Sequence, residues 1–257
     1  MSPSQGTDSP VADVHARAGV EAEHRTANRN MFERIAPTYD LLNRLLSGGT
    51  DARWRARAVG ALPSIGTGAV LDLCAGTMDL SALVARAHPD SRIVALDFSA
   101  AMLEAGRRKV PQAEVVVGDA ASLPFEDATF AAVICGFGMR NLADPSQGAR
   151  EVARVLRPNG VFVTLELFRP ANLAARAFHE AYAKVVLPSL GGLVSGDRVA
   201  YRYLARSMGS FFTREEYEDV LRSAGFVDVA GADLTLGVAS IVRAKRAERT
   251  GEIGGGA

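Results

Sequence analysis

The 257-residue sequence has few cysteines and histidines and no excess of charge of either sign. Two cysteines and four histidines offer too few partners for a disulfide framework or a metal site, so we expect no metal. Basic and acidic residues both number 29, and this balance does not favour nucleic acid as a partner. Cys74 and Cys135 come at the ends of expected strands, and we interpret both as small buried hydrophobic residues.

Long hydrophobic runs are also missing. No apolar stretch approaches the roughly 20 residues that a membrane span needs, and residues 1–10 are polar, without the apolar core of a signal peptide. We therefore expect a cytoplasmic protein and leave open peripheral contact with the inner face of the membrane, since a local apolar patch can still touch a bilayer. Residues 1–25 are expected to form a flexible segment and residues 247–257 a disordered tail.

The most informative stretch that is present covers residues 69–80, an apolar run that stops at small residues and resumes with helical spacing. It predicts a buried strand, a tight turn and the start of a helix. Such a turn exposes backbone N–H groups at the carboxyl edge of a sheet, where a nucleotide-like ligand can approach. A dinucleotide-binding turn would read G-x-G-x-x-G, but only Gly76 is present, with Cys74 and Met78 at the flanking positions.

The rest of the chain alternates between strand and helix patterns and predicts one α/β domain over residues 26–246. Further strands are expected at 92–97, 113–118, 130–136 and 160–167, and helices at 79–88, 99–110 and 145–157. Residues 26–62 read as short helices interrupted by Pro37 and by Gly48-Gly49. Residues 173–186 read as an amphipathic segment, and residues 197–207 and 213–224 as helices, the second marked by a Thr213/Glu216 capping box. Residues 226–229 and 238–243 would close the sheet as a hairpin.

Carboxylates at successive strand ends suggest which ligand this edge binds. Asp97 ends the second strand, where a carboxylate can accept hydrogen bonds from both ribose hydroxyls. Asp119 follows the third strand and could accept from an adenine amino group, and Asp72 belongs to the first strand. Three acids without a second phosphate-type loop suit an adenosine ligand that carries no pyrophosphate. S-adenosylmethionine is such a ligand.

At this point the chain resembles the class I S-adenosylmethionine-dependent methyltransferases, and among them the C-methyltransferases of menaquinone and ubiquinone biosynthesis. The matching segments are residues 31–40 with Asn43, 71–79, 136–141, 165–166 and 201–204. The resemblance implies a Rossmann-like, seven-stranded, mostly parallel sheet with helices on both faces and an antiparallel last strand. It also implies a helical lid at 26–62, substrate-side helices within 170–212, and a prenylated quinol as substrate. A homodimer is left open.

The resemblance also implies site residues. Positions that contact S-adenosylmethionine in the family are matched by Thr77, Asp97, Asp119, Ala120 and Gly136, with Gly76 in the turn and Tyr39 near the ligand. Tyr39 could instead be only a helix-packing aromatic, and Asp72 could either orient the turn or reach the methionine amino group. Relatives commonly carry glycine where this chain has Met78, whose side chain would narrow the cofactor's approach or alter the turn.

Arg140 and Asn141 follow the fourth strand and are the catalytic candidates. Methyl transfer to a ring carbon needs an electron-rich ring, so a cation that stabilises a quinol anion and an amide that holds the ring oxygen would both assist. Arginine is too basic to accept the ring proton, which leaves a water held by this pair, Glu166 or Asp40. Alternatively, Arg140 only forms a salt bridge to a loop carboxylate.

Three other functions remain to be weighed against the quinol C-methyltransferase. The same residues would serve a methyltransferase for another aromatic metabolite, or a protein that binds S-adenosylmethionine without catalysis. A nicotinamide-dependent dehydrogenase is disfavoured by the missing glycines. The sequence distinguishes neither a naphthoquinol from a benzoquinol nor one tail length from another.

Overall fold

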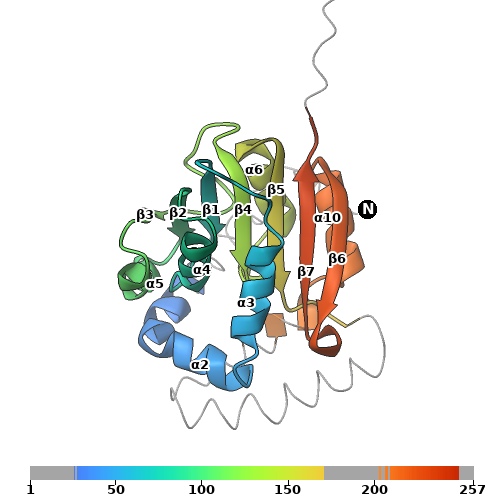
Figure 1. Ribbon diagram of the computed structural model, residues 1–257. Coiled ribbons are helices and arrows are strands. Elements are labelled where there is room, and N and C mark those ends of the chain that lie inside the picture. The colour runs from blue at the N-terminus through green and yellow to red at the C-terminus, as the bar shows by residue number, and fades with distance from the viewer. Residues whose placement is uncertain (1–25, 27, 171–202, 204–205, 208, 249–257) are drawn as a thin grey trace, which may run out of the picture.

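The computed structural model describes residues 26, 28–170, 203, 206–207 and 209–248. Within them lies a seven-stranded sheet with the order β3-β2-β1-β4-β5-β7-β6 (Figure 1). The strands are β1 (Ala69–Leu73), β2 (Arg92–Asp97), β3 (Glu114–Val117), β4 (Phe130–Gly136), β5 (Leu156–Glu166), β6 (Phe226–Leu234) and β7 (Ala239–Arg246). Strands β1 to β5 pair in parallel, and β7 runs antiparallel to both β5 and β6. The mostly parallel sheet with an antiparallel last strand is therefore confirmed.

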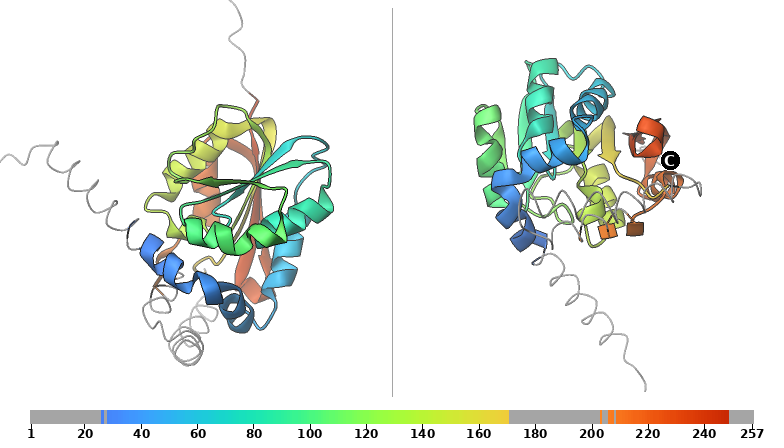
Figure 2. Two further views of the ribbon diagram at one scale, coloured as in Figure 1. Left: turned by 90° about the vertical axis from the view of Figure 1, so that its left-hand side faces the viewer. Right: turned by 90° about the horizontal axis from the view of Figure 1, so that it is seen from below.

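Helices cover both faces of this sheet (Figures 1 and 2). One face carries α3 (Asp51–Gly60), α4 (Asp79–Ala87) and α5 (Ala100–Gly106), and the other carries α6 (Pro145–Val155) and α10 (Arg214–Ser223). Side chains of β1 alternate between the two cores: Val70 packs with the first group and Leu71 with the second. All five residues of β1 are buried, as expected of a central parallel strand covered on both sides.

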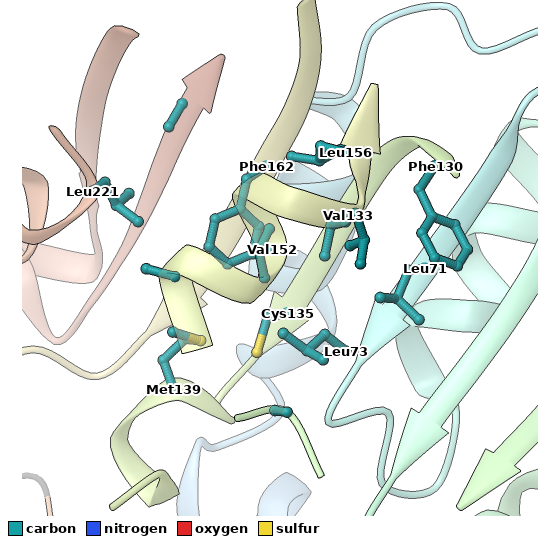
Figure 3. Close-up of a cluster of buried hydrophobic side chains, with 14 of the residues drawn as sticks. Leu71, Leu73, Phe130, Val133, Cys135, Met139, Val152, Leu156, Phe162 and Leu221 are labelled. Carbon is teal, nitrogen blue, oxygen red and sulfur yellow. The ribbon is translucent and has the colours of Figure 1, made fainter. Parts of the chain in front are cut away.

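The second core is centred on β4 and β5 (Figure 3). Val133 and Phe162 point from these strands toward Val152 of α6, and all three side chains are fully buried. The start of helix α6 is fixed by its N-cap residue: the Asp144 side chain accepts hydrogen bonds from the backbone N–H groups of Ser146 and Gln147. A rigid α6 fixes the loop between β4 and α6, which carries part of the site.

Several element boundaries differ from those expected. The helix expected at 145–157 ends at Val155, because the buried Leu156 already pairs with Phe130 as the first residue of β5. The helix expected at 99–110 ends at Gly106 and continues as the 3-10 turn η2 (Arg107–Lys109). The C-terminal hairpin is longer than expected, since β6 and β7 pair from Phe226 to Arg246.

Of the remaining predictions, one is confirmed, and several concern residues that the structure does not describe. The capping box of Thr213 and Glu216 is formed at the start of α10. The amphipathic segment 173–186, most of 197–207, residues 1–25 and most of the tail lie outside the described residues. None of the helices among the described residues combines the length and apolar character that crossing a bilayer requires.

The N-terminal helices lie at the carboxyl ends of the parallel strands, at the bottom of Figure 1. Residues 28–35 are helical and are followed by η1 (Ala36–Thr38), α2 (Tyr39–Leu46) and α3. Pro37 is the second residue of the short turn η1, and Gly48 and Gly49 separate α2 from α3 with positive φ angles. Met31 and Ile35 pack against Met102 of α5, which holds these helices against the body of the domain.

Candidate active site

The turn between β1 and α4 is built from residues in an uncommon backbone conformation. Cys74, Gly76 and Met78 have φ angles of 55°, 52° and 62°, in the left-handed region that favours glycine. The Gly76 N–H donates to Asp97 Oδ2 (2.8 Å), and the Ala75 N–H donates to the Leu96 carbonyl (2.9 Å). The turn is thus tied to the end of β2, next to a carboxylate.

A cavity of about 280 Å³ opens beside this turn, near the lower end of the range for small-molecule sites. We call it the cofactor cavity. Seven of the ten residues expected in the site line it: Tyr39, Gly76, Asp97, Asp119, Ala120, Gly136 and Asn141. Its apolar wall includes Phe32, Phe98 and Met102. The carboxyl ends of β2, β3 and β4 therefore meet at this cavity.

Asp97 is the most constrained carboxylate on the cavity wall. Its side chain accepts from the backbone N–H groups of Gly76 and Ser99, at 2.8 and 2.9 Å, and the residue is only 4% exposed. Burial raises the pKa of Asp97 to about 6, although the hydrogen bonds from Ser99 and Gly76 act in the opposite direction. A carboxylate oxygen has room for two hydrogen bonds, so Asp97 keeps acceptor capacity for a ligand.

Two of the expected cofactor residues do not reach this cavity. Asp72 accepts from the Ser81 N–H (2.8 Å) and the Ser81 hydroxyl (2.6 Å), so it fixes the first turn of α4. Burial raises the pKa of Asp72 to about 7, and its Oδ1 has no hydrogen-bond partner among the described residues. The Thr77 hydroxyl donates to Asp40 of α2. Of the two roles considered for Asp72, the geometry favours orienting the turn.

Asp40 connects α2 to the body of the domain rather than facing a ligand. It pairs with Lys109 at 2.6 Å, and the same ammonium pairs with Asp79 of α4, also at 2.6 Å. Together with Thr77, these side chains form what we call the α2 latch. Because Asp40 lines neither this cavity nor the groove described next, the geometry does not support it as a proton acceptor.

The Met78 side chain does not narrow the cofactor cavity as expected. It is fully buried among the apolar residues between the sheet and helices α3 to α5, and it does not line the cavity. Gly106 of α5 lies against the same backbone: a Cβ there would come within 2.4 Å of the Thr77 carbonyl oxygen. Residue 78 thus has a left-handed backbone, and its side chain packs in the hydrophobic core rather than in the cofactor cavity.

A second, smaller cavity of about 50 Å³ adjoins the first, between the helical residues 28–35 and α2. We call it the acceptor groove. Met31, Ile35, Leu42 and Leu46 give it apolar walls, and Arg140, Asn43 and Tyr203 are polar residues along it. Both cavities are lined by Phe32, Tyr39 and Asn141. These three residues mark the place where ligands in the two cavities would meet.

Arg140, in the turn η3 (Met139–Asn141), faces the acceptor groove with its charge held in place. Its guanidinium donates to Glu166 of β5 and to the Phe137 carbonyl (2.8 Å), and lies 5.8 Å from the Phe137 ring centre. Burial acts to lower the pKa of Arg140, but the Glu166 carboxylate, together with Tyr39 and Tyr203, acts in the opposite direction, and the net effect is a raised pKa. Arg140 thus forms a salt bridge, but with a fully buried strand carboxylate rather than with a loop carboxylate, and it still lines the groove.

Asn141 is positioned by three groups, none of which the sequence indicated as a site residue. Its side-chain N–H donates to the Phe137 carbonyl (3.0 Å), and its Oδ1 accepts from the Tyr203 hydroxyl (3.1 Å). The Asn28 side chain donates to the Asn141 carbonyl (3.1 Å). Tyr203 belongs to a segment that matched the family without a stated role, and Asn28 carries no sequence signal that could have identified it.

Sequence comparisons match the chain to one family of known proteins. The sequence model of the ubiE/COQ5 methyltransferase family matches residues 20–246. The chain is 43% identical to a demethylmenaquinone methyltransferase of Thermus thermophilus over 82% of this chain and 97% of that one. It is also 43% identical to a ubiquinone/menaquinone biosynthesis C-methyltransferase of Geobacter sulfurreducens, over 83% of this chain and 86% of that one.

Solved structures share the fold at low sequence identity. The [4+2]-cyclase SpnF matches with a TM-score of 0.64 and 17% identity, over 86% of this chain and 96% of its own. A possible histamine N-methyltransferase of Thermotoga maritima matches with a TM-score of 0.62 and 19% identity, over 85% and 99%. At this identity the likeness concerns the fold alone, and it confirms the Rossmann-like α/β class expected from the sequence.

Proposed function

The chain belongs to the ubiE/COQ5 methyltransferase family, and on this premise we propose that it transfers a methyl group from S-adenosylmethionine to a ring carbon of a prenylated quinol. Demethylmenaquinol, or the equivalent precursor of ubiquinone, is the substrate that the names of the relatives suggest. Family membership confirms the expected class of enzyme and its cofactor. The ring and the residue roles below are our proposal.

The cofactor cavity fits an adenosyl ligand. Asp97 would accept from the ribose hydroxyls, and Asp119 and Ala120 would lie beside the adenine. A Cβ at Gly136 would come within 2.6 Å of Leu80, so glycine allows the close packing at this part of the wall. When bound, S-adenosylmethionine supplies an electrophilic methyl group on a sulfonium.

The acceptor groove suits an aromatic ring with an apolar tail. Arg140 would stabilise the anion of a quinol hydroxyl, because its charge is fixed by Glu166, and Asn141 would hold the ring oxygen. Among the described residues that line the groove there is no carboxylate, and the Glu166 oxygens are engaged by Arg140 and by the Leu167 N–H. We therefore assign the ring proton to a water held by Arg140 and Asn141.

The observation that carries the proposal is that the two cavities share part of their lining. Displacement at a methyl carbon needs the donor, the carbon and the nucleophile in line, at short distances and without intervening water. Phe32, Tyr39 and Asn141 line both cavities, so a ring in the groove would lie next to a ligand in the cofactor cavity. Tyr39 and the rest of α2 would act as a lid over both ligands.

The proposal is tested by incubating the purified protein with S-adenosylmethionine labelled on its methyl group. The acceptors are a chemically reduced prenylated naphthoquinol, the prenylated benzoquinol precursor and a phenol without a tail. We expect label on a prenylated quinol and none on the corresponding oxidised quinone. Transfer to the tail-less phenol alone would indicate another aromatic substrate, and tight cofactor binding without any transfer would indicate a non-catalytic protein.

A pair of arginine variants tests the role of Arg140. Arg140→Met removes the cation at the groove and should lower kcat about 100-fold, with unchanged affinity for S-adenosylhomocysteine. Arg92→Met is the matched control, because Arg92 lies on β2 with an exposed side chain and pairs only with Glu114 among the ion pairs of the described residues. An equal loss in both variants, or a loss confined to cofactor affinity, would contradict the proposed role.

A further inference from the structure

Helix α2 is apolar on two sides. Leu42 and Leu46 line the acceptor groove, whereas Leu41 and Leu45 are 53% and 42% exposed. Residues four apart lie on the same side of a helix, so Leu41 and Leu45 form a pair on the outer side. A helix on the surface of a soluble domain normally carries polar residues there. We call this pair the outer leucines of α2.

The outer leucines stand apart from the other large apolar side chains exposed among the described residues. Those are Val117 on β3 and Val227 on β6, one on each strand. Only the outer leucines lie side by side, and only they belong to a helix that borders the acceptor groove. The exposed apolar surface is therefore concentrated where the acceptor would enter.

The charge around α2 is positive, although the whole chain is neutral. Residues 28–60 contain six arginines and three carboxylates. Of these carboxylates, Asp40 pairs with Lys109 and Asp51 with the buried Arg55. Arg34, Arg44, Arg53 and Arg57 are exposed on the same helices. Apolar side chains among exposed arginines are the combination that binds the surface of an anionic bilayer.

We propose that α2 docks on an anionic lipid bilayer through Leu41 and Leu45, with the acceptor groove beside the membrane surface. The inference rests on the proposed function in one respect, the prenylated acceptor. Each CH2 group buried in lipid contributes about 0.8 kcal/mol, so a long prenyl tail keeps the quinol in the membrane. The enzyme must therefore take the ring up at the bilayer surface, and the apolar groove beside α2 is the path that the structure offers.

The first test measures vesicle binding without substrate. The full chain is sedimented with vesicles of phosphatidylcholine containing one third phosphatidylglycerol, and with pure phosphatidylcholine vesicles. We compare the wild type with Leu41→Gln/Leu45→Gln, which keeps good helix formers in α2, and with Val227→Gln as an exposed apolar control. The double variant should bind anionic vesicles about tenfold more weakly, and the control should bind like the wild type. Equal binding by the double variant, or no binding by the wild type, would overturn the proposal.

The second test separates docking from catalysis. On a short-tailed quinol dispersed in detergent, the double variant should match the wild type, because the outer leucines line neither cavity. On a long-tailed quinol in anionic vesicles, its kcat/KM should fall about tenfold. If the wild type methylates the vesicle-bound quinol and the double variant does so equally well, docking through α2 is refuted while the proposed function stands. If the wild type methylates neither quinol, the proposed function fails, and vesicle binding alone decides the docking.

A second copy of the chain is the other occupant that the outer leucines could contact. Sedimentation velocity of the wild type and the double variant distinguishes this case. We expect the same oligomeric state for both. A wild-type dimer that the double substitution converts to a monomer would show a protein interface and overturn the lipid assignment.

Discussion

The Asp97 carboxyl group combines a raised pKa with a position on the wall of the cofactor cavity. Its folded-state pKa of about 6 lies above the value of an unfolded chain. The protonated form therefore contributes stability to the cofactor-free protein at low pH, and this contribution is lost as the pH rises through about 6. A carboxylate accepts hydrogen bonds from ribose hydroxyls better than a protonated carboxyl group does, so the affinity for the cofactor changes in the opposite direction.

We expect the affinity for S-adenosylhomocysteine to rise about tenfold between pH 5 and pH 7, as Asp97 loses its proton. Titration calorimetry at several pH values measures this. Asp97→Asn should weaken binding at pH 7 by about 2 kcal/mol and remove the step near pH 6. Glu114→Gln is the control, because Glu114 is exposed on β3 and does not line the cavity. The same step in Asp97→Asn would show that another group titrates.

Met78 has a strained, left-handed backbone conformation and a fully buried side chain, and these two features affect stability in opposite directions. Met78→Gly would relieve about 1 kcal/mol of left-handed strain but remove a fully buried side chain, which costs 2–5 kcal/mol. The loss is larger, so urea unfolding should show a destabilisation of about 2 kcal/mol. Affinity for S-adenosylhomocysteine should stay within about threefold. Met102→Ala provides the contrast: Met102 lines the cavity, so both quantities should fall. A large drop in affinity for Met78→Gly alone would mean that the side chain shapes the turn.

Helix α2 is held to the body of the domain by the α2 latch. Lys109 bridges Asp40 and Asp79, and all three side chains are partly exposed, so each ion pair contributes only about 0–1 kcal/mol. Lys109→Met should therefore increase the dissociation rate of S-adenosylhomocysteine about threefold, measured by stopped-flow displacement. High salt should have a similar effect on the wild type. Arg107→Met, which removes only an exposed pair with Glu104, should leave the rate unchanged, and an equal rise in both variants would argue against a latch.

The elements of the fold could be predicted from the sequence more completely than the directions of the side chains. Strands β2 and β4 and helix α4 agree with expectation to within one residue, because buried strands and amphipathic helices leave clear periodic patterns. The carboxyl end of β2 also located Asp97. The turn after β1 left no comparable pattern, since its alternating backbone conformations decide that Thr77 faces Asp40 rather than the cavity.

Contacts between distant segments could not be predicted at all. Asn28 reaches Asn141 across 113 positions and Tyr203 reaches it across 62. A single sequence has no periodicity that records such a meeting, because it depends on how the N-terminal helices settle on the finished sheet. The same limit applies to Arg140. The sequence predicts its position after β4, but it does not indicate which acidic residue pairs with it, and the structure shows that this residue is the buried Glu166.

At the scale of the whole molecule, the site lies where the strand order reverses. From β1 the sheet continues through β2 and β3 on one side and through β4 and β5 on the other. The loops that follow β1 and β4 therefore lead to opposite sides of the sheet. Loops diverge at such a point and leave a crevice at the carboxyl ends of the strands. Asp97 from one half and Asn141 from the other both line the cofactor cavity there. A ligand bound in this cavity would therefore contact both halves of the sheet.

This arrangement predicts a graded pattern of amide hydrogen exchange. Strands β1 and β4, with mostly buried residues and neighbours on both sides, should exchange only through near-global unfolding. The α2 helix has a single buried residue, Leu42, and should exchange faster. Saturating S-adenosylhomocysteine should slow exchange in α2, because Tyr39 lines the cofactor cavity, and should leave the edge strand β6 nearly unchanged. Mass spectrometry of peptic fragments measures all three segments at once. Equal slowing in α2 and β6 would mean that the ligand only raises global stability and that α2 does not close over the site.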